Sequence, residues 1–169
     1  MSSNNITPQE YLELSAIAFE WADSYDSKDW TRLEAILAPT LRVDYSDIGK
    51  QCWPSMTSAD FLAMVMDVNF LGDPCVKTQH LLGAAKWIKK SEDQVVGHLQ
   101  IRAAHQVYTT ADCREVKLRG HSHATNELYF SKVDGVWKFA GLKPRVHWNE
   151  HAFEHVFKGS YTDTVAASL

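Results

Sequence analysis

The feature that most constrains the fold is a change in the pattern of apolar residues near position 76. From there to position 148, apolar and polar side chains alternate over long stretches, which is the pattern of half-buried strands. A polar turn at 91–93 and the dipeptide Asp134-Gly135, typical of two-residue hairpin turns, interrupt this pattern. We therefore expect a curved, mixed or antiparallel sheet whose long strands cover residues 76–89, 94–108, 114–133 and 136–148.

The first third of the chain has a helical pattern instead. Thr7 supplies an N-cap hydroxyl, Pro8 occupies the first helical position and Glu10 the third, a combination that predicts a helix over 8–27. Its inward stripe is expected to contain Tyr11, Leu14, Ala18, Trp21, Ala22 and Tyr25.

Shorter elements follow the first helix. We expect a second helix between Asp29 and Pro39, a strand over 40–45, and a third helix that opens at 57–60 and continues through Val68. The inward residues of the second helix are expected to be Leu33, Ile36 and Leu37. A short amphipathic helix over residues 151–157 is expected to close the structure. Helices followed by long strands predict the α+β class, with the N-terminal helices packed on one side of the sheet.

Composition limits the class of protein. The chain has 169 residues, which suits a single domain over 1–169, with 1–7 and 160–169 expected to be loose tails. The 17 Lys and Arg against 21 Asp and Glu give a net charge of −4, which argues against nucleic acid as a partner. The three cysteines show neither a disulfide framework nor zinc-site spacing. No secretory signal and no apolar run of roughly 20 residues is evident, so we expect a soluble intracellular protein, cytoplasmic or endosomal, that does not bind membranes.

Alternation along two strands places two polar residues on the inward face. In 99–107, His105 shares its face with apolar residues, and in 122–130 Asn126 does the same. A buried polar group without a hydrogen bond costs about 1–3 kcal/mol, so each residue needs a partner. Either the two line a ligand pocket, or they satisfy each other inside a solid core. The alternation pattern leaves both interpretations open.

Other polar residues are less informative when taken singly. His80 lies near a strand start, Tyr25 and Asp26 end the first helix, and Tyr45 ends a short strand. Each of these positions is compatible with a purely structural role.

Several kinds of site lack support in the sequence. His121 and His123 form an H-x-H pair that could grip a metal, but the pair faces away from Asn126, and we expect no metal site. There is no nucleophile elbow, P-loop or dinucleotide-binding glycine pattern, so covalent, phosphoryl-transfer and redox-cofactor chemistry are unsupported.

Several sequence blocks point to one family. They are EWADSYDSKDW at 20–30, APTLRVDY at 38–45, LGDP at 71–74, TQH at 78–80, GHSH at 120–123 and DGVWKFAGLKP at 134–144. On these blocks the chain resembles scytalone dehydratase, a fungal melanin-pathway family, in one collinear register from about Tyr11 to Phe157. The resemblance implies a cone-shaped α+β barrel of the nuclear-transport-factor-2-like type, with a central pocket, usually assembled as a homotrimer. It also implies cofactor-free loss of water from a hydroxylated naphthalenone, an aromatic polyketide intermediate of the scytalone or vermelone type.

The resemblance also implies roles for individual residues. Tyr25 and Tyr45 match two phenols that hold a water against the substrate carbonyl, as an oxyanion hole does. His80 and His105 match the imidazoles of acid/base catalysis, and which of them moves which proton stays open. Asp26 matches a carboxylate that orients a histidine.

Substrate-binding residues follow from the same resemblance. Asn126 matches an amide that holds a substrate hydroxyl, while Phe153 and Phe157 match an aromatic lid that excludes water. The remaining pocket wall is expected to include Ile48, Met64, Phe70 and Pro144.

Three positions depart from the family pattern. Ala124 stands where the family has a serine that helps to hold an active-site water, Ile48 replaces a phenylalanine, and Phe70 replaces a valine. Swaps in a hydrophobic pocket typically shift selectivity by about 1–3 kcal/mol, so the reaction type is better supported than the substrate. Two alternatives stay open: a related dehydratase, isomerase or cyclase of another polyketide pathway, and a non-catalytic carrier of an aromatic ligand.

Overall fold

The computed structural model describes residues 5–46 and 51–157. Helices dominate its first part and long strands its second, as the sequence pattern predicts. The elements are α1 (Pro8–Ser27), α2 (Trp30–Ile36), β1 (Leu37–Asp44), β2 (Cys52–Thr57), α3 (Ser58–Met66), β3 (Val76–Ser91), β4 (Gln94–Tyr108), β5 (Val116–Val133), β6 (Val136–His151) and the 3₁₀ turn η2 (Phe153–His155).

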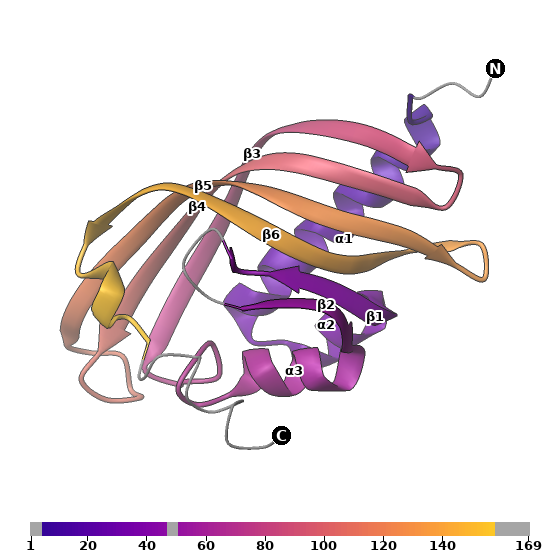
Figure 1. Cartoon of the computed structure of the whole chain (residues 1–169). Helices are drawn as coiled ribbons and strands as arrows, with labels where there is room; N and C mark the ends of the chain where they lie inside the picture. Colours follow the sequence, from indigo (N-terminus) through magenta and orange to yellow (C-terminus); the bar gives the residue numbers. More distant parts are fainter. Residues whose placement is uncertain (1–4, 47–50, 158–169) are drawn as a thin grey trace.

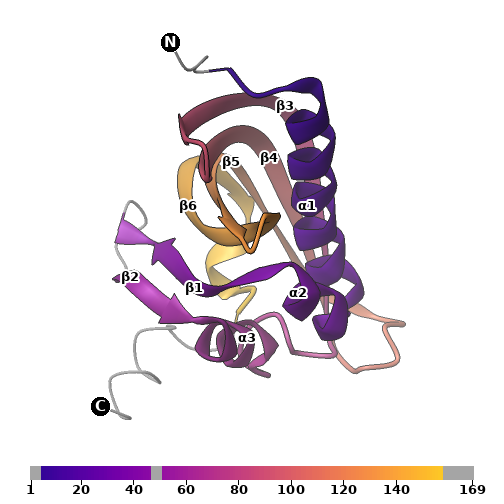
Figure 2. The same ribbon diagram turned by 90° about the vertical axis from the view of Figure 1, so that its right-hand side faces the viewer.

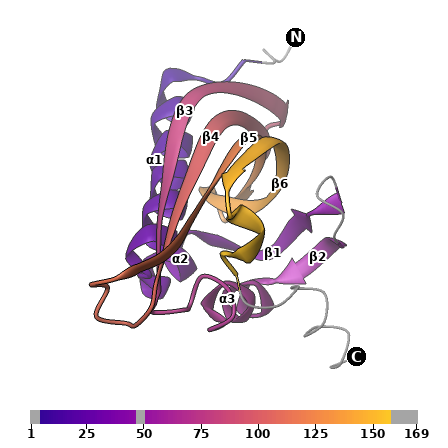
Figure 3. The same cartoon turned by 90° about the vertical axis from the view of Figure 1, so that its left-hand side faces the viewer.

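The strands form one six-stranded sheet in the order β2-β1-β6-β5-β4-β3. Every neighbouring pair is antiparallel except β1 and β6, which run parallel. The sheet curves strongly without closing, and α1 lies alongside β3 while α3 lies beneath β1 and β2 (Figures 1, 2 and 3). The expected α+β class, with helices packed against a curved mixed sheet, is confirmed.

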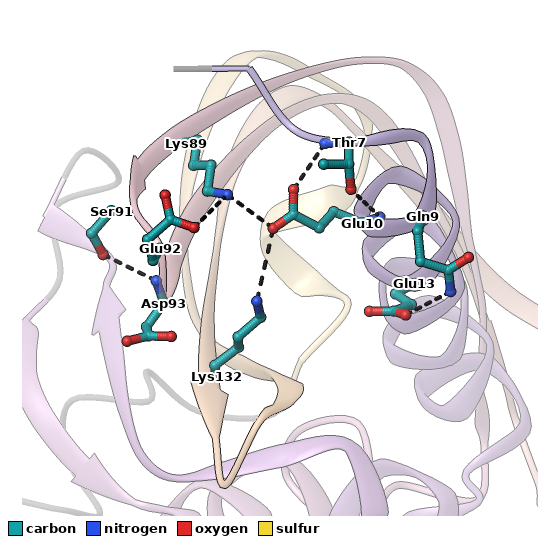
Figure 4. Close-up of polar contacts among 9 residues, drawn as sticks. All are labelled: Thr7, Gln9, Glu10, Glu13, Lys89, Ser91, Glu92, Asp93 and Lys132. Carbon is teal, nitrogen blue, oxygen red and sulfur yellow. Dashed lines mark hydrogen bonds and ion pairs between the residues drawn. The ribbon is translucent and has the colours of Figure 1, made fainter. Parts of the chain in front are cut away.

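The start of α1 explains how this helix is fixed to the sheet. The Thr7 hydroxyl accepts a hydrogen bond from the Glu10 amide, and the Glu10 carboxylate accepts one from the Thr7 amide, which completes a capping box. Glu10 is buried, and its carboxylate also lies 3.1 Å from the Lys89 ammonium and 3.9 Å from that of Lys132 (Figure 4). One carboxylate thus joins the N-terminus of α1 to the ends of β3 and β5.

Most of the predicted inward stripe of α1 is buried, but Tyr11 is not. Its side chain is 50% exposed and stands edge-on to Trp87 on β3. Glu10 takes the inward position in this first turn because its carboxylate is used by the cap and the two lysines.

The short elements differ more from the prediction. The strand β2 was not predicted; it is an edge strand with mostly exposed side chains and contains Pro54, a residue that edge strands tolerate. Helix α3 ends at Met66, and Val68 is exposed rather than buried. The predicted helix over 151–157 is wrong, because β6 continues to His151 and only a three-residue 3₁₀ turn follows.

The long strands carry the predicted inward faces. His105 and Asn126 are both buried, at 4% and 6% exposure, among apolar neighbours on β4 and β5.

No helix within residues 5–46 and 51–157 is long and apolar enough to cross a membrane. The residues predicted as a C-terminal tail, 160–169, lie outside the described residues, as do residues 1–4.

Candidate active site

A cavity of about 790 Å³ lies between α1 and the inward face of the sheet. It is large enough for a bicyclic organic molecule, since ligand pockets typically measure about 300–1,000 Å³. Its wall is formed by Trp21, Tyr25, Tyr45, Phe70, Leu71, His80, Ile101, Ala103, His105, Ser122, Ala124, Asn126, Leu142, Pro144, Val146, Asn149, Phe153, Glu154, His155 and Phe157. The two inward polar residues therefore line a pocket instead of satisfying each other in a solid core.

A carboxylate and an imidazole form the best-defined contact of the site. Asp26, at the end of α1, lies 2.6 Å from Nδ1 of His80 on β3. Its other oxygen accepts the His80 backbone amide at 2.7 Å, and the Thr78 hydroxyl donates to the first. Burial alone would raise the pKa of Asp26, but the hydrogen bonds and charge of His80, with Thr78, outweigh it and hold the pKa below 3.8. The ionised carboxylate fixes a proton on Nδ1, which leaves Nε2 of His80 for a ligand.

His105 has a different environment. Its Nδ1 lies 3.2 Å from the carbonyl oxygen of Gly120, and a carbonyl can only accept, so Nδ1 carries the proton. Burial, followed by the charge of His80, lowers the pKa of His105 from 6.5 to about 4. The two imidazole rings are 6.0 Å apart and nearly perpendicular. At neutral pH His105 is a neutral imidazole whose Nε2 accepts hydrogen bonds.

Two tyrosines also line the cavity. Tyr25 is 4% exposed, and its ring stands edge-on to His80 at 5.6 Å. Tyr45 follows β1 and stands edge-on to Trp53 of β2. Burial raises the pKa of the Tyr45 phenol, so this hydroxyl stays protonated and can donate a hydrogen bond.

Asn126 presents an amide to the cavity from β5. It is almost fully buried, and within the described part of the chain its Oδ1 atom has no hydrogen-bond partner. A buried amide oxygen without a partner costs about 1–3 kcal/mol, which a bound hydroxyl would offset. This unpaired group therefore indicates a ligand that carries a donor.

Aromatic residues cover one end of the cavity. Phe153 and Phe157 each lie 5.4 Å from the His105 ring, and Phe157 packs on Phe70 at 4.7 Å. Gly120 permits this arrangement, because a Cβ atom there would lie only 2.4 Å from the Phe153 backbone. These rings shield the His105 imidazole from bulk water.

Comparison with known proteins decides the family. The family model described as scytalone dehydratase matches residues 5–164. The chain belongs to the scytalone dehydratase family.

Relatives within the scytalone dehydratase family match most of the chain. The scytalone dehydratase-like protein Arp1 of Metarhizium guizhouense is 61% identical over 163 residues, covering 96% of this chain and 88% of that protein. The scytalone dehydratase of Pyricularia oryzae is 47% identical over 156 residues, covering 92% and 91%. The family is one of hydro-lyases, so this protein is a carbon–oxygen lyase.

Solved structures support the fold alone. The Kfla4162 protein from Kribbella flavida superimposes with a TM-score of 0.70 at 16% identity, covering 84% of this chain and 93% of that one. The hexachlorocyclohexane dehydrochlorinase LinA-type3 from Novosphingobium barchaimii gives a TM-score of 0.64 at 14% identity, covering 90% and 96%.

The structure brings together most residues that the scytalone dehydratase resemblance singled out. Those that line the cavity are Tyr25, Tyr45, Phe70, His80, His105, Asn126, Pro144, Phe153 and Phe157. Asp26 reaches it through His80. Met64 was expected on the wall, but it is buried in the core cluster and does not line the cavity. Ile48 lies outside the described residues.

Some lining residues were not singled out from the sequence. Ser122 follows the same alternation as Ala124 and Asn126, so the reasoning that placed Asn126 inward could have found it. Asn149 and Glu154 could not be found this way, because they lie where β6 ends and gives way to η2.

The H-x-H pair faces outward, as predicted. His123 stacks on Trp148 and lies 3.2 Å from Glu150, while His121 contacts His151. Within residues 5–46 and 51–157, no three His, Cys, Asp or Glu side chains are grouped to hold a metal ion.

Proposed function

We propose that this lyase removes water from a hydroxylated, partly reduced naphthalenone, such as scytalone or a vermelone-like polyketide, in a melanin-type pathway and without a cofactor. The observation that carries the proposal is the Asp26–His80 pair at the wall of a cavity that also contains two tyrosines. A carboxylate that holds Nδ1 stabilises the imidazolium formed when Nε2 accepts a proton.

His80 is the better base of the two histidines. It would take a proton from the carbon next to the substrate carbonyl, and the electron pair of that C–H bond would form an enolate. Tyr25 and Tyr45, directly or through a water, would donate hydrogen bonds to the enolate oxygen. The enolate then collapses to a C=C bond as the C–O bond at the neighbouring carbon breaks, and the departing hydroxyl takes the proton back from His80 and leaves as water.

His105 and Asn126 would position the reacting groups. Because the pKa of His105 is lowered to about 4, its neutral ring accepts a hydrogen bond and does not supply a proton at neutral pH. Its Nε2 would hold the leaving hydroxyl from one side. The unpaired Oδ1 of Asn126 would accept a hydrogen bond from a second substrate hydroxyl.

The test is a steady-state absorbance assay with scytalone on the wild type and on His80→Asn, His105→Asn and His147→Asn. His147 is an exposed histidine on β6 and serves as the control. Loss of general acid–base catalysis should lower kcat/KM of the His80 variant by about 10²–10⁴-fold. Unchanged turnover of that variant would refute the assigned role.

A second candidate keeps the chemistry and changes the substrate. Ala124 lacks the hydroxyl that the family pattern has at this position, and Phe70, which stands in place of a valine of that pattern, packs against the lid residue Phe157. These features favour a related dehydration, isomerisation or ring closure in another polyketide pathway. Turnover of scytalone at the rate of a melanin-pathway enzyme would exclude this candidate. Binding of naphthalenones without turnover would instead support an aromatic-ligand carrier.

The family resemblance also supports a homotrimer. Light scattering of the purified protein tests this assembly, and a monomeric mass would contradict it.

A further inference from the structure

Ser122 lines the cavity, but the proposed mechanism assigns it no role. It is 7% exposed, lines the cavity, and lies on the same inward face of β5 as Ala124 and Asn126. None of the side-chain hydrogen bonds among the described residues involves its hydroxyl. A buried hydroxyl on a cavity wall is favourable when a ligand or a water supplies its partner.

The strand register places Ser122 close to His105. Ser122 pairs with Ala103 on β4, and the next inward pair is Gly120 with His105. Ser122 and His105 are therefore diagonal neighbours, which lie about 7–8 Å apart in antiparallel sheets, with their Cβ atoms somewhat closer. Ala103, which also lines the cavity, has only a methyl group, so no bulky side chain of β4 stands between Ser122 and His105.

A second polar group borders the same space. Ser122 pairs with Asn149 on β6, and Asn149 also lines the cavity. Ser122, Asn149 and His105 thus occupy neighbouring positions on the cavity wall. Ala124, the next inward residue along β5, contributes no hydrogen-bonding group.

The opposite end of the same strand face carries Asn126. Asn126 is four positions beyond Ser122 along the extended strand, so the Cα atoms of the two residues lie roughly 13 Å apart. Between them the wall is apolar, with Ala124, Ile101 and Val146. A ligand that satisfies both ends is a flat bicyclic ring system with an oxygen at each end.

We propose that Ser122, supported by Asn149, is a specificity-determining residue that binds a substrate oxygen beside His105, at the end of the cavity opposite Asn126. This inference deepens the proposed function and rests on it for the identity of the ring system. The hydroxyl selects ligands with two distant oxygens and disfavours those with one.

The test is calorimetric binding of two probes, 2,6-dihydroxynaphthalene and 2-naphthol, which differ by one distal hydroxyl. The wild type should bind the diol more tightly. Ser122→Ala should weaken diol binding by roughly threefold to tenfold, the contribution of one hydrogen bond, and leave 2-naphthol binding unchanged. Ser131→Ala, on the outward face of β5, is the matched control and should bind both probes as the wild type does.

The inference is overturned if Ser122→Ala binds both probes like the wild type, or weakens both equally. Calorimetric binding requires no turnover, so the experiment tests the role of Ser122 separately from the proposed dehydratase function. A preference for the diol that Ser122→Ala removes, in a wild type that does not dehydrate scytalone, would support the role of Ser122 and count against the proposed function.

Discussion

In the proposed mechanism, Asp26 acts on its partner His80 through charge as well as geometry. In Asp26→Asn, the amide oxygen can still accept the His80 proton, but the negative charge that stabilises the imidazolium is lost. We expect kcat/KM to fall by about 100-fold or more, mainly through kcat.

The control for this prediction is Asp23→Asn on the same helix. Asp23 pairs with Arg32 at the surface and should be neutral for turnover. Equal turnover in the wild type and the Asp26 variant would show that the contact only holds α1 against β3.

The buried His105 predicts how stability depends on pH. In the unfolded chain this imidazole takes up a proton near pH 6.5, whereas in the folded protein burial lowers its pKa to about 4. The unfolded state therefore binds more protons in this window, and the free energy of unfolding falls as pH drops from about 6.5 to about 4. The contribution is on the order of 3 kcal/mol.

Urea denaturation at pH 7, 5.5 and 4.5 measures the effect of His105. Its contribution should be absent in His105→Gln and present in His147→Gln, whose ring is exposed. Parallel pH curves for the wild type and the His105 variant would contradict the prediction.

At the scale of elements, η2 depends on the absence of a side chain at Gly120. A Cβ atom there would lie 2.4 Å from Cα of Phe153 and 2.7 Å from Cγ2 of Val156. Gly120→Ala should displace η2 from the His105 ring, raise KM several-fold and speed hydrogen exchange in residues 152–157. Overpacking of this kind typically costs about 1–3 kcal/mol.

Gly83→Ala is the control for this substitution. Its added Cβ would approach only the side chain and backbone of exposed Gln100, at 3.3 Å or more. If Gly120→Ala left KM and hydrogen exchange in residues 152–157 unchanged, η2 would be able to accommodate the added Cβ atom without an effect on the site.

The elements also show which parts of the fold can be predicted from local sequence patterns. The strands of the second half were predictable because alternation and Asp134-Gly135 fix their faces and one hairpin. The edge strand β2 lacks such a pattern, since only Met56 of its six residues is buried. The ending at His151 was missed because pairing with β5, a tertiary contact, extends β6.

The candidate site also has a part that local sequence patterns predict and a part that they do not. Alternation alone predicted the inward positions of His105 and Asn126. The contact between Asp26 and His80 spans 54 positions and joins a helix end to a strand, so no local pattern indicates it, and only the family resemblance did. Met64 illustrates the limit of that resemblance, because its side chain is buried in the core instead of on the cavity wall.

At the scale of the whole molecule, Glu10 ties the first helix to the far ends of two long strands, remote from the cavity. Glu10→Ala removes part of the capping box and leaves Lys132 without this carboxylate. We expect thermal denaturation to show a loss of about 1 kcal/mol or more, the usual effect of a lost cap, with kcat/KM unchanged.

Glu13→Ala, which removes only an exposed contact with Gln9, is the control for the Glu10 substitution. A Glu10 variant as stable as this control would show that the cluster contributes nothing to stability.

The parallel pairing of β1 with β6 has a consequence for how the chain is made. The first strand, β1, pairs with β2, which follows it closely in the chain, but its other neighbour is β6, so the β1–β2 pair joins the rest of the sheet only after β6 has been made. Until then, the edge of β1 that pairs with β6 has no partner strand, whereas α1 can already pack against β3. Non-local pairing of this kind slows folding and prolongs the exposure of apolar surface and unpaired strand edges. The cavity, whose wall includes Trp21 of α1 as well as Phe153 and Phe157, is therefore completed only after β6 and η2 have been made.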